Sequence, residues 1–162
     1  MSWWADWGKD VVLAILALYG AGLTTLTVRQ ALKKERRAVK VELATVRPTY
    51  GPEIGPPHAK VVATNIGSRK VTISEVYLAC SEGKLVSFAH NPVPWLPDTP
   101  LPAVIEDGES AHMCMSYADI GQALLRAGFK GKVLLTPMAR DTTGGAYRGN
   151  AWKTDAADLL HV

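Results

Sequence analysis

The chain has 162 residues, a hydrophobic fraction of 48% and a formal net charge of +3. This length supports one ordinary domain with an appendage and excludes a second full domain. Residues 1–40 hold seven basic and three acidic side chains, which leaves a net charge of −1 for the other 122 residues. A near-neutral domain lacks the basic face that phosphate binding requires, so we expect no nucleic-acid partner.

Residues 11–28 form an uncharged apolar run, VVLAILALYGAGLTTLTV. At about 1.5 Å per residue, a helix of this length reaches roughly 27 Å, close to the hydrocarbon thickness of a bilayer. The run therefore predicts a single transmembrane helix within residues 1–29. A cleaved signal peptide is the first alternative. It is disfavoured because signal peptides have positive charge before the apolar core, whereas in this chain the positive charge follows the apolar run. A buried core helix is the other alternative.

The flanks of this run indicate how it lies in a membrane. The preceding tryptophans have amphipathic indole rings that favour the headgroup level, and the following cations mark the cytoplasmic side. These interface residues are Trp3, Trp4, Trp7, Arg29, Lys33, Lys34, Arg36 and Arg37. We expect the N-terminus outside, the domain in the cytoplasm, and the basic linker of residues 30–40 near anionic lipid. The cations as orientation signals alone are the alternative.

Small side chains recur at helical spacing within the run. They are Ala14, Ala17, Ala21 and Thr25. A face of small residues permits close helix packing in lipid, so we predict a homodimer or a second transmembrane partner. The alternative is that such residues are simply common in membrane helices.

Beyond residue 40 the hydrophobic pattern changes to strand-like alternation. Val39, Val41 and Leu43 fall on one face of a strand. In the strand over 70–80, the apolar positions change face between Ile73 and Val76, which predicts an irregularity. Further strands are predicted over 59–65, 84–90, 133–140 and 146–154, and after a turn at 106–109. A short helix is predicted over 118–128, and proline-rich loops over 48–57 and 91–102.

This pattern predicts an all-β, antiparallel immunoglobulin-like β-sandwich over residues 41–158, with one short helical crossover and a tail over 159–162. A barrel is the alternative. The sequence Asp141-Thr142-Thr143-Gly144-Gly145 is typical of a hairpin turn between the last two strands.

The motifs VKVELATV, TNIGSRKVTISEVYL, DGESAHMCMSYADIGQALLRAG and DTTGGAYRG follow the basic flank in this order. In this arrangement the chain resembles uncharacterised bacterial single-pass membrane proteins with an N-terminal helix and a small immunoglobulin-like β-sandwich domain. The resemblance covers nearly the whole chain and implies a fold and a topology. Its motifs are turn and core patterns, so it implies no functional residue.

Two cysteines and two histidines are the candidates for a metal site or a disulfide. Cys80 and Cys114 could pair between sheets, but a reducing cytoplasm favours free, buried thiols. His112 and Cys114 alternate on a strand and could join Cys80 or His90 around zinc. The chain contains no C-x-x-C pair, so we expect neither a metal nor a cofactor.

No residue set has the arrangement of a catalytic site. Ser110 or Ser116 with His112 lies on one short strand, where neighbours point to opposite faces, and no G-x-S-x-G elbow is present. We therefore predict no catalytic residue and no enzyme. The alternative is a small hydrolase or metal-dependent enzyme using His112, Cys114 and the turn at 107–109.

The proline loop offers the strongest candidate for a binding surface. A tryptophan held among prolines presents a large apolar area at low entropic cost. The predicted partner-binding residues are Trp95, Pro94, Pro97 and Tyr50. Trp95 as a lid on the core is the alternative. We thus predict a membrane-anchored, non-enzymatic accessory module in the bacterial inner membrane whose cytoplasmic domain binds a protein. A structural subunit of a membrane assembly is a further alternative.

Overall fold

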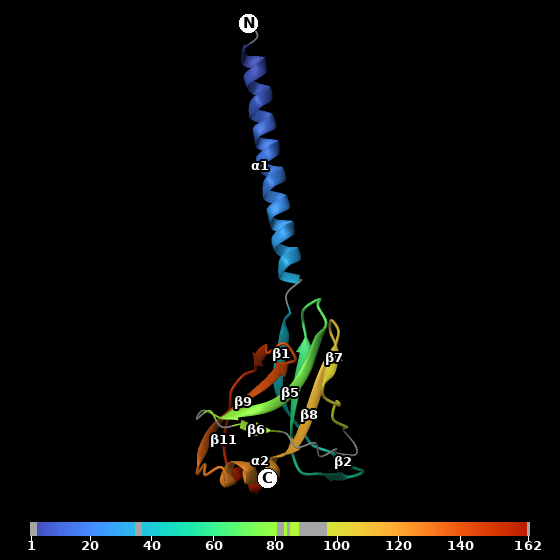
Figure 1. Cartoon of the computed structure of the whole chain (residues 1–162), viewed down its shortest axis with the longest axis vertical. Helices are drawn as coiled ribbons and strands as arrows, with labels where there is room; N and C mark the ends of the chain where they lie inside the picture. The colour runs from blue at the N-terminus through green and yellow to red at the C-terminus, as the bar shows by residue number, and fades with distance from the viewer. Residues whose placement is uncertain (1–2, 35–36, 81–82, 84, 88–96, 162) are drawn as a thin grey trace. The chain divides into compact units, whose positions relative to one another are not determined.

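The computed structural model describes residues 3–34, 37–80, 83, 85–87 and 97–161 (Figure 1). The chain divides into two compact units, residues 1–36 and 37–162. The described residues of the first unit form one helix, α1 (Trp3–Lys34). Within it, Val11–Ala31 is a 21-residue segment of mean hydropathy 2.1, none of which is buried. This segment is long and apolar enough to cross a membrane, by length and composition.

The helix is longer than the sequence analysis predicted. Residues 30–34, which we assigned to the basic linker, are helical because alanine, leucine, lysine and glutamine are all good helix formers. The first strand begins at Val39 and therefore includes the last two residues of the predicted linker.

The second unit is mostly β and contains two antiparallel sheets with a short helix (Figure 1). The three-stranded sheet has the order β1 (Val39–Val46), β4 (His58–Asn65), β8 (Ser110–Ser116). The six-stranded sheet has the order β10 (Ala146–Arg148), β9 (Lys132–Asp141), β5 (Val71–Cys80), β6 (Leu85–Ser87), with β11 (Trp152–Asp155) on β9 and β7 (Ala103–Ile105) on β5. The short elements are β2 (Thr49–Tyr50), β3 (Glu53–Ile54), α2 (Tyr117–Arg126) and η1 (Asp158–Leu160).

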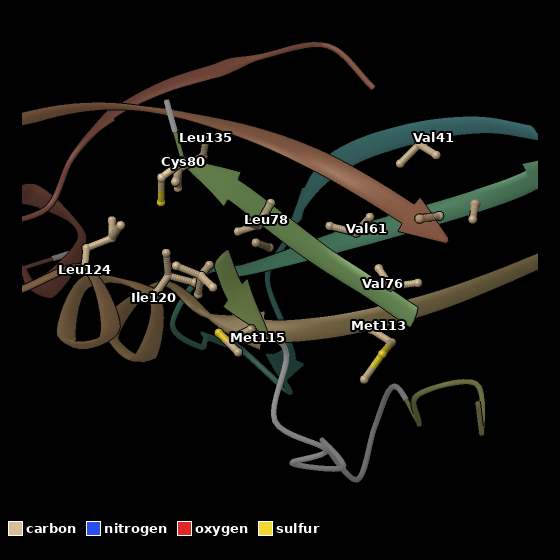
Figure 2. Packing of buried hydrophobic residues seen from close by; sticks show 14 of the residues in the cluster. Val41, Val61, Val76, Leu78, Cys80, Met113, Met115, Ile120, Leu124 and Leu135 are labelled. Carbon is tan, nitrogen blue, oxygen red and sulfur yellow. The ribbon is translucent and has the colours of Figure 1, made fainter. Parts of the chain in front are cut away.

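Both sheets and α2 contribute apolar side chains to one core cluster (Figure 2). Val41 is 4% exposed between two exposed neighbours, as the alternation of β1 predicted. Ile120 and Leu124, four residues apart on α2, are both fully buried, which places one face of the helix on the core. Burial of each such aliphatic side chain contributes about 1.5–3 kcal/mol to the stability of the fold.

The predicted irregularity in β5 is confirmed. The register of β5 against β9 shifts between Ile73 and Glu75, which is the mark of a β-bulge. Ile73 and Val76 are both buried although they are three positions apart along the strand, which in a regular strand would place them on opposite faces. The bulge thus lets both halves of the strand face the same core.

The predicted strand over 146–154 is two strands, β10 and β11, which both pair with β9. The break lies opposite Pro137, which has no amide hydrogen to donate to a neighbouring strand. Gly149 donates its backbone N–H to the Pro137 carbonyl at 2.9 Å. A Cβ on Gly149 would lie 2.4 Å from the Val41 carbonyl oxygen, so only glycine fits the break.

Three further boundaries differ from the predictions. The loop over 48–57 contains the β2–β3 hairpin, and β7, which we did not predict, pairs with Val71–Ile73 of β5. The residue Leu159, assigned to a tail, is 3% exposed and belongs to the core. It is held there because η1 packs closely against Gly121 of α2.

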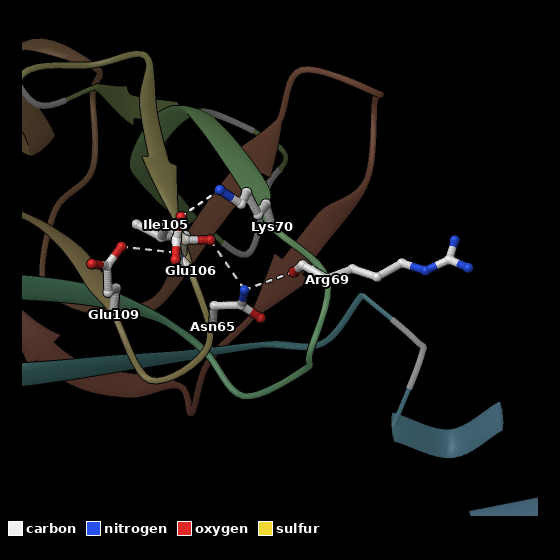
Figure 3. Close-up of polar contacts among 6 residues, drawn as sticks. All are labelled: Asn65, Arg69, Lys70, Ile105, Glu106 and Glu109. Carbon is white, nitrogen blue, oxygen red and sulfur yellow. Dashed lines mark hydrogen bonds and ion pairs between the residues drawn. The ribbon is translucent and has the colours of Figure 1, made fainter. Parts of the chain in front are cut away.

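Two turns of the β domain are joined through one buried polar side chain (Figure 3). Asn65 is fully buried, and its amide nitrogen donates to the carbonyls of Arg69 at 2.8 Å and Ile105 at 3.1 Å. Its amide oxygen accepts from the Gly67 N–H at 3.0 Å, and its own carbonyl accepts from the Gly108 N–H at 2.9 Å. Asn65 therefore ties the β4–β5 turn to the turn between β7 and β8.

Candidate functional site

The predicted binding loop is described only at its C-terminal end. Trp95, Pro94 and the candidate ligand His90 lie outside the described residues, and for Tyr50 the backbone of β2 is described. Pro97 is exposed. Their role in binding a partner therefore stays a prediction.

The end of this loop is fixed to the free edge of β8. The Thr99 N–H donates to the His112 carbonyl at 2.9 Å, and the His112 N–H donates to the Thr99 hydroxyl at 3.0 Å. The Cys114 N–H donates to Oδ1 of Asp98 at 2.7 Å. Because β8 ends the three-stranded sheet, these bonds satisfy backbone groups that an edge strand otherwise exposes. We name residues 97–99 with their β8 contacts the loop anchor.

The imidazole of His112 belongs to the loop anchor. Its Nε2 lies 3.1 Å from the Pro97 carbonyl, which only accepts, so Nε2 carries the proton. Its Nδ1 then accepts from the Thr99 hydroxyl at 3.3 Å. Burial, and secondly the nearby Lys60, lower the pKa of His112, while the Pro97 bond and Asp98 oppose them. The neutral ring therefore has both nitrogens engaged in holding the loop.

The thiol of Cys114 is unreactive. Burial, followed by the charge of Asp98, raises its pKa to about 11, so it is protonated at neutral pH and is not a nucleophile. Cys114 alternates with the core residues Met113 and Met115, whereas Cys80 lies in the core cluster. Both cysteines are buried. Among the described residues no three histidine, cysteine or acidic side chains gather as metal ligands.

The Asp141 turn joins β9 to β10, as predicted. Oδ1 of Asp141 accepts from the Thr143 N–H at 2.8 Å, the Thr143 hydroxyl at 2.7 Å and the Gly145 N–H at 2.8 Å. Oδ2 accepts from the Tyr147 hydroxyl at 2.8 Å. Burial opposes ionisation, but these hydrogen bonds outweigh it and lower the pKa of Asp141. Both carboxylate oxygens therefore accept hydrogen bonds that hold the turn.

Burial, together with Asp141, raises the pKa of Tyr147 to about 12. Arg37, which we predicted to lie at the membrane interface, donates from Nη1 to the Thr143 hydroxyl at 2.8 Å. This contact with the Asp141 turn could not be read from the sequence, because 106 residues separate the two side chains.

The other predicted interface residues lie on α1, except Arg36, which is outside the described residues. Arg29 is exposed, and for the remainder only the helical backbone is described: Trp3, Trp4, Trp7, Lys33 and Lys34. The predicted packing residues are all exposed: Ala14, Ala17, Ala21 and Thr25.

The threonine hydroxyls of α1 donate hydrogen bonds within the helix. Thr24 donates to the Gly20 carbonyl at 2.7 Å, and Thr25 donates to the Ala21 carbonyl at 2.8 Å. Thr27 donates in the same way to the carbonyl four residues earlier. With its hydrogen used inside the helix, Thr25 can only accept a bond from a neighbouring helix.

Two pockets, each of about 450 Å³, are lined mostly by residues of the large sheet. The first, the lysine pocket, is lined by Lys132, Val133, Leu134, Lys153, Thr154, Asp155 and Asp158. The second, the arginine pocket, is lined by Ala79, Cys80, Gly83, Leu134, Thr136, Met138 and Arg148. Among the described lining residues, two lysines and two aspartates balance in the lysine pocket, whereas Arg148 has no acidic counterpart in the arginine pocket. Neither pocket was predicted, because its lining comes from distant segments.

The fold defines a small β-rich domain preceded by an exposed apolar helix. No protein-family model matches the chain, and no curated protein matches it. The chain is similar to a solved X-ray structure of a structural genomics target, SoR45 of the Northeast Structural Genomics Consortium. The identity is 9% over 80% of this chain and 93% of that chain, with a TM-score of 0.27. A likeness at that TM-score carries no argument about fold or function.

Proposed function

We propose that this chain is a single-pass, non-enzymatic membrane protein that presents its β domain to a protein partner. The observation that carries the proposal is the exposure of the whole Val11–Ala31 segment. Twenty-one helical residues reach roughly 32 Å, enough for the hydrocarbon of a bilayer. An apolar surface of this size is unfavourable in water, and hydroxyl groups bonded within their own helix suit an apolar surrounding.

The charges on either side of the helix support one orientation of the protein in the membrane. Lys9 is flanked by Asp6 and Asp10 on the N-terminal side, while cations dominate residues 29–40. By the positive-inside rule the β domain then lies in the cytoplasm, at the inner membrane of a bacterium.

We infer further that the β domain is an immunoglobulin-like sandwich. In that fold the first, second and fifth strands share one sheet, and the third, sixth and seventh strands share the other. The order β1-β4-β8 against β10-β9-β5-β6 supports this arrangement, with α2 linking the two sheets between β8 and β9. The strand β7 departs from it by pairing with β5.

The proposed contact surface is the proline loop that contains Trp95. The loop anchor supports this choice, since three hydrogen bonds to β8 limit the freedom of the loop at residues 97–99. A loop fixed in advance loses less entropy on binding. Tethering to the membrane also raises the effective concentration of the domain for a partner in the same bilayer.

Reporter fusions at Val162 test the topology. We expect a fluorescent protein fused there to fluoresce and alkaline phosphatase fused there to be inactive, because the phosphatase folds only in the periplasm. An active phosphatase would contradict the orientation. Release of the chain from membranes by alkaline carbonate would contradict the anchor itself.

Binding is tested by capture of partners with the full-length protein in mild detergent. We expect Trp95→Ala to lose a protein that the unchanged chain and Trp95→Phe both retain. Capture that is equal in all three samples would remove Trp95 from the contact surface.

A further inference from the structure

We propose that the arginine pocket binds a small apolar molecule with a single carboxylate. Its volume of about 450 Å³ falls within the range typical of small-molecule sites. The apolar part of its lining includes Ala79, Leu134 and Met138, which come from β5 and β9. These side chains offer a short alkyl chain a surface away from water.

Arg148 supplies the charge that selects a carboxylate. It is the only charged residue in the described lining of this pocket, and no ion pair within the described chain involves it. The neighbouring Arg140 differs, because it pairs with Glu75 at 3.4 Å and lies 5.9 Å from the centre of the Tyr77 ring. The guanidinium of Arg148 is therefore available to a ligand. Guanidinium groups bind carboxylates through paired hydrogen bonds.

Thr136 offers a second polar group in the same pocket. The residue is 5% exposed, and within the described chain no hydrogen bond occupies its hydroxyl. The sheet register pairs Thr136 with Ala79 and Arg148 with Met138. Since Thr136 and Met138 are two residues apart on β9, they share one face, and both Thr136 and Arg148 line one pocket.

The lysine pocket is a useful contrast. It has the same volume and shares Leu134, but its described lining contains Lys132 and Lys153 together with Asp155 and Asp158. Its balanced charges give no preference for an anion. We therefore expect the arginine pocket, and not the lysine pocket, to prefer a carboxylate over an uncharged apolar molecule.

Methyl resonances of methionine provide the test, with the full chain held in phosphatidylcholine nanodiscs and hexanoate as the probe. Of four methionines, Met138 lines the pocket, whereas Met113 and Met115 are buried in the core. We expect hexanoate to shift the Met138 methyl signal saturably and to leave the two core signals in place. Hexanol, which has the same chain without the charge, should bind more weakly.

Variants separate the charge from the shape of the pocket. Arg148→Gln should weaken hexanoate binding roughly tenfold and leave hexanol unaffected, because a charge-assisted hydrogen bond is lost. Thr136→Val should weaken it less, and Lys153→Gln, in the lysine pocket, is the matched control with no effect. Equal binding of hexanoate and hexanol, an unmoved Met138 signal, or binding of a glutamate-containing peptide in place of hexanoate would overturn the proposal. These readouts require neither a partner protein nor a given topology, so they are independent of the proposed function.

Discussion

The helix α1 and the β domain use the same apolar side chains in opposite ways. Leu18 on α1 is 74% exposed, whereas Leu78 on β5 is fully buried. The domain gains stability from contacts among its own side chains. The described span Val11–Ala31 of the helix is not buried at all, so the surroundings of the chain decide where its apolar surface is stable.

The hydrogen bonds of polar side chains also differ between the two regions, in how far apart the bonded residues lie along the chain. The hydroxyls of Thr24 and Thr25 bond to carbonyls four residues earlier, within one helix. In the β domain, Asn65 reaches the carbonyl of Ile105, forty residues along the chain. Local bonds suit a helix that stands alone in lipid, whereas distant bonds bind the turns of a domain together.

The largest expected effect comes from one substitution made in both regions. Leu78→Ala should lower the free energy of unfolding of the β domain by about 4 kcal/mol, through lost burial and a cavity. Leu18→Ala should leave it unchanged, because this side chain is outside the core. Urea unfolding of both variants in detergent, followed by near-UV circular dichroism, measures the difference. A comparable loss in Leu18→Ala would break the separation of the two regions.

A smaller loss is expected when the distant polar bonds are removed. Asn65→Ala should lower the free energy of unfolding by about 2 kcal/mol, because two carbonyls and the Gly67 N–H lose their partner in a buried place. Urea unfolding measures this loss, and Asn150→Ala, at an exposed position, is the matched control. If Asn65→Ala matched that control, the two turns would not depend on Asn65.

Local patterns predicted most of this fold. The alternation of β1, the change of face in β5 and the Asp141 turn follow from short-range sequence rules, and each is found. The strand β7 was missed because three residues beside a proline loop give no periodic signal. The split of residues 146–154 was missed because its cause, Pro137, lies on another strand.

Removal of one bond within the Asp141 turn has a still smaller expected effect. Tyr147→Phe should cost about 1 kcal/mol in the free energy of unfolding, since the phenol hydroxyl donates to Asp141. The pKa of Asp141 is lowered in the folded state, so its contribution is present above the ordinary value of 3.8 and is lost as the pH falls through the folded pKa.

Urea midpoints of Tyr147→Phe and the unchanged protein between pH 2 and pH 6 measure both effects. The gap between the two proteins should narrow at the acid end, where Asp141 is protonated and a neutral acceptor gives a weaker bond. A gap independent of pH would mean that the charge of Asp141 does not strengthen this contact.

The loop anchor was beyond prediction for a physical reason. Asp98 stands among prolines, where an acidic residue is normally exposed, yet it is 6% exposed and accepts from the Cys114 N–H. His112 was singled out from the sequence, but as a metal ligand or catalytic base. Its two ring contacts come from Pro97 and Thr99, whose proximity depends on the return of the loop to β8.

The smallest expected effect is the response of this anchor to pH. Because the pKa of His112 is lowered in the folded state, its neutral form stabilises the fold fully above the ordinary value of 6.5. This contribution falls as the pH drops from 6.5 through the folded pKa, since protonated Nδ1 no longer accepts from Thr99. Lys60 adds repulsion, while Asp98 limits the loss.

Hydrogen exchange measures this response locally, at two amides of the anchor. The protection factors of the Thr99 and Cys114 N–H groups should fall as the pH is lowered from 7 to 5, after correction for the slower intrinsic exchange at lower pH. His112→Gln should lose this fall in protection, and His161→Gln, at an exposed position, should keep it. No such fall is expected in α1, because the hydrogen bonds of its threonines involve no titrating group. Retention of the full response in His112→Gln would assign it to another group and leave the two regions alike in their dependence on pH.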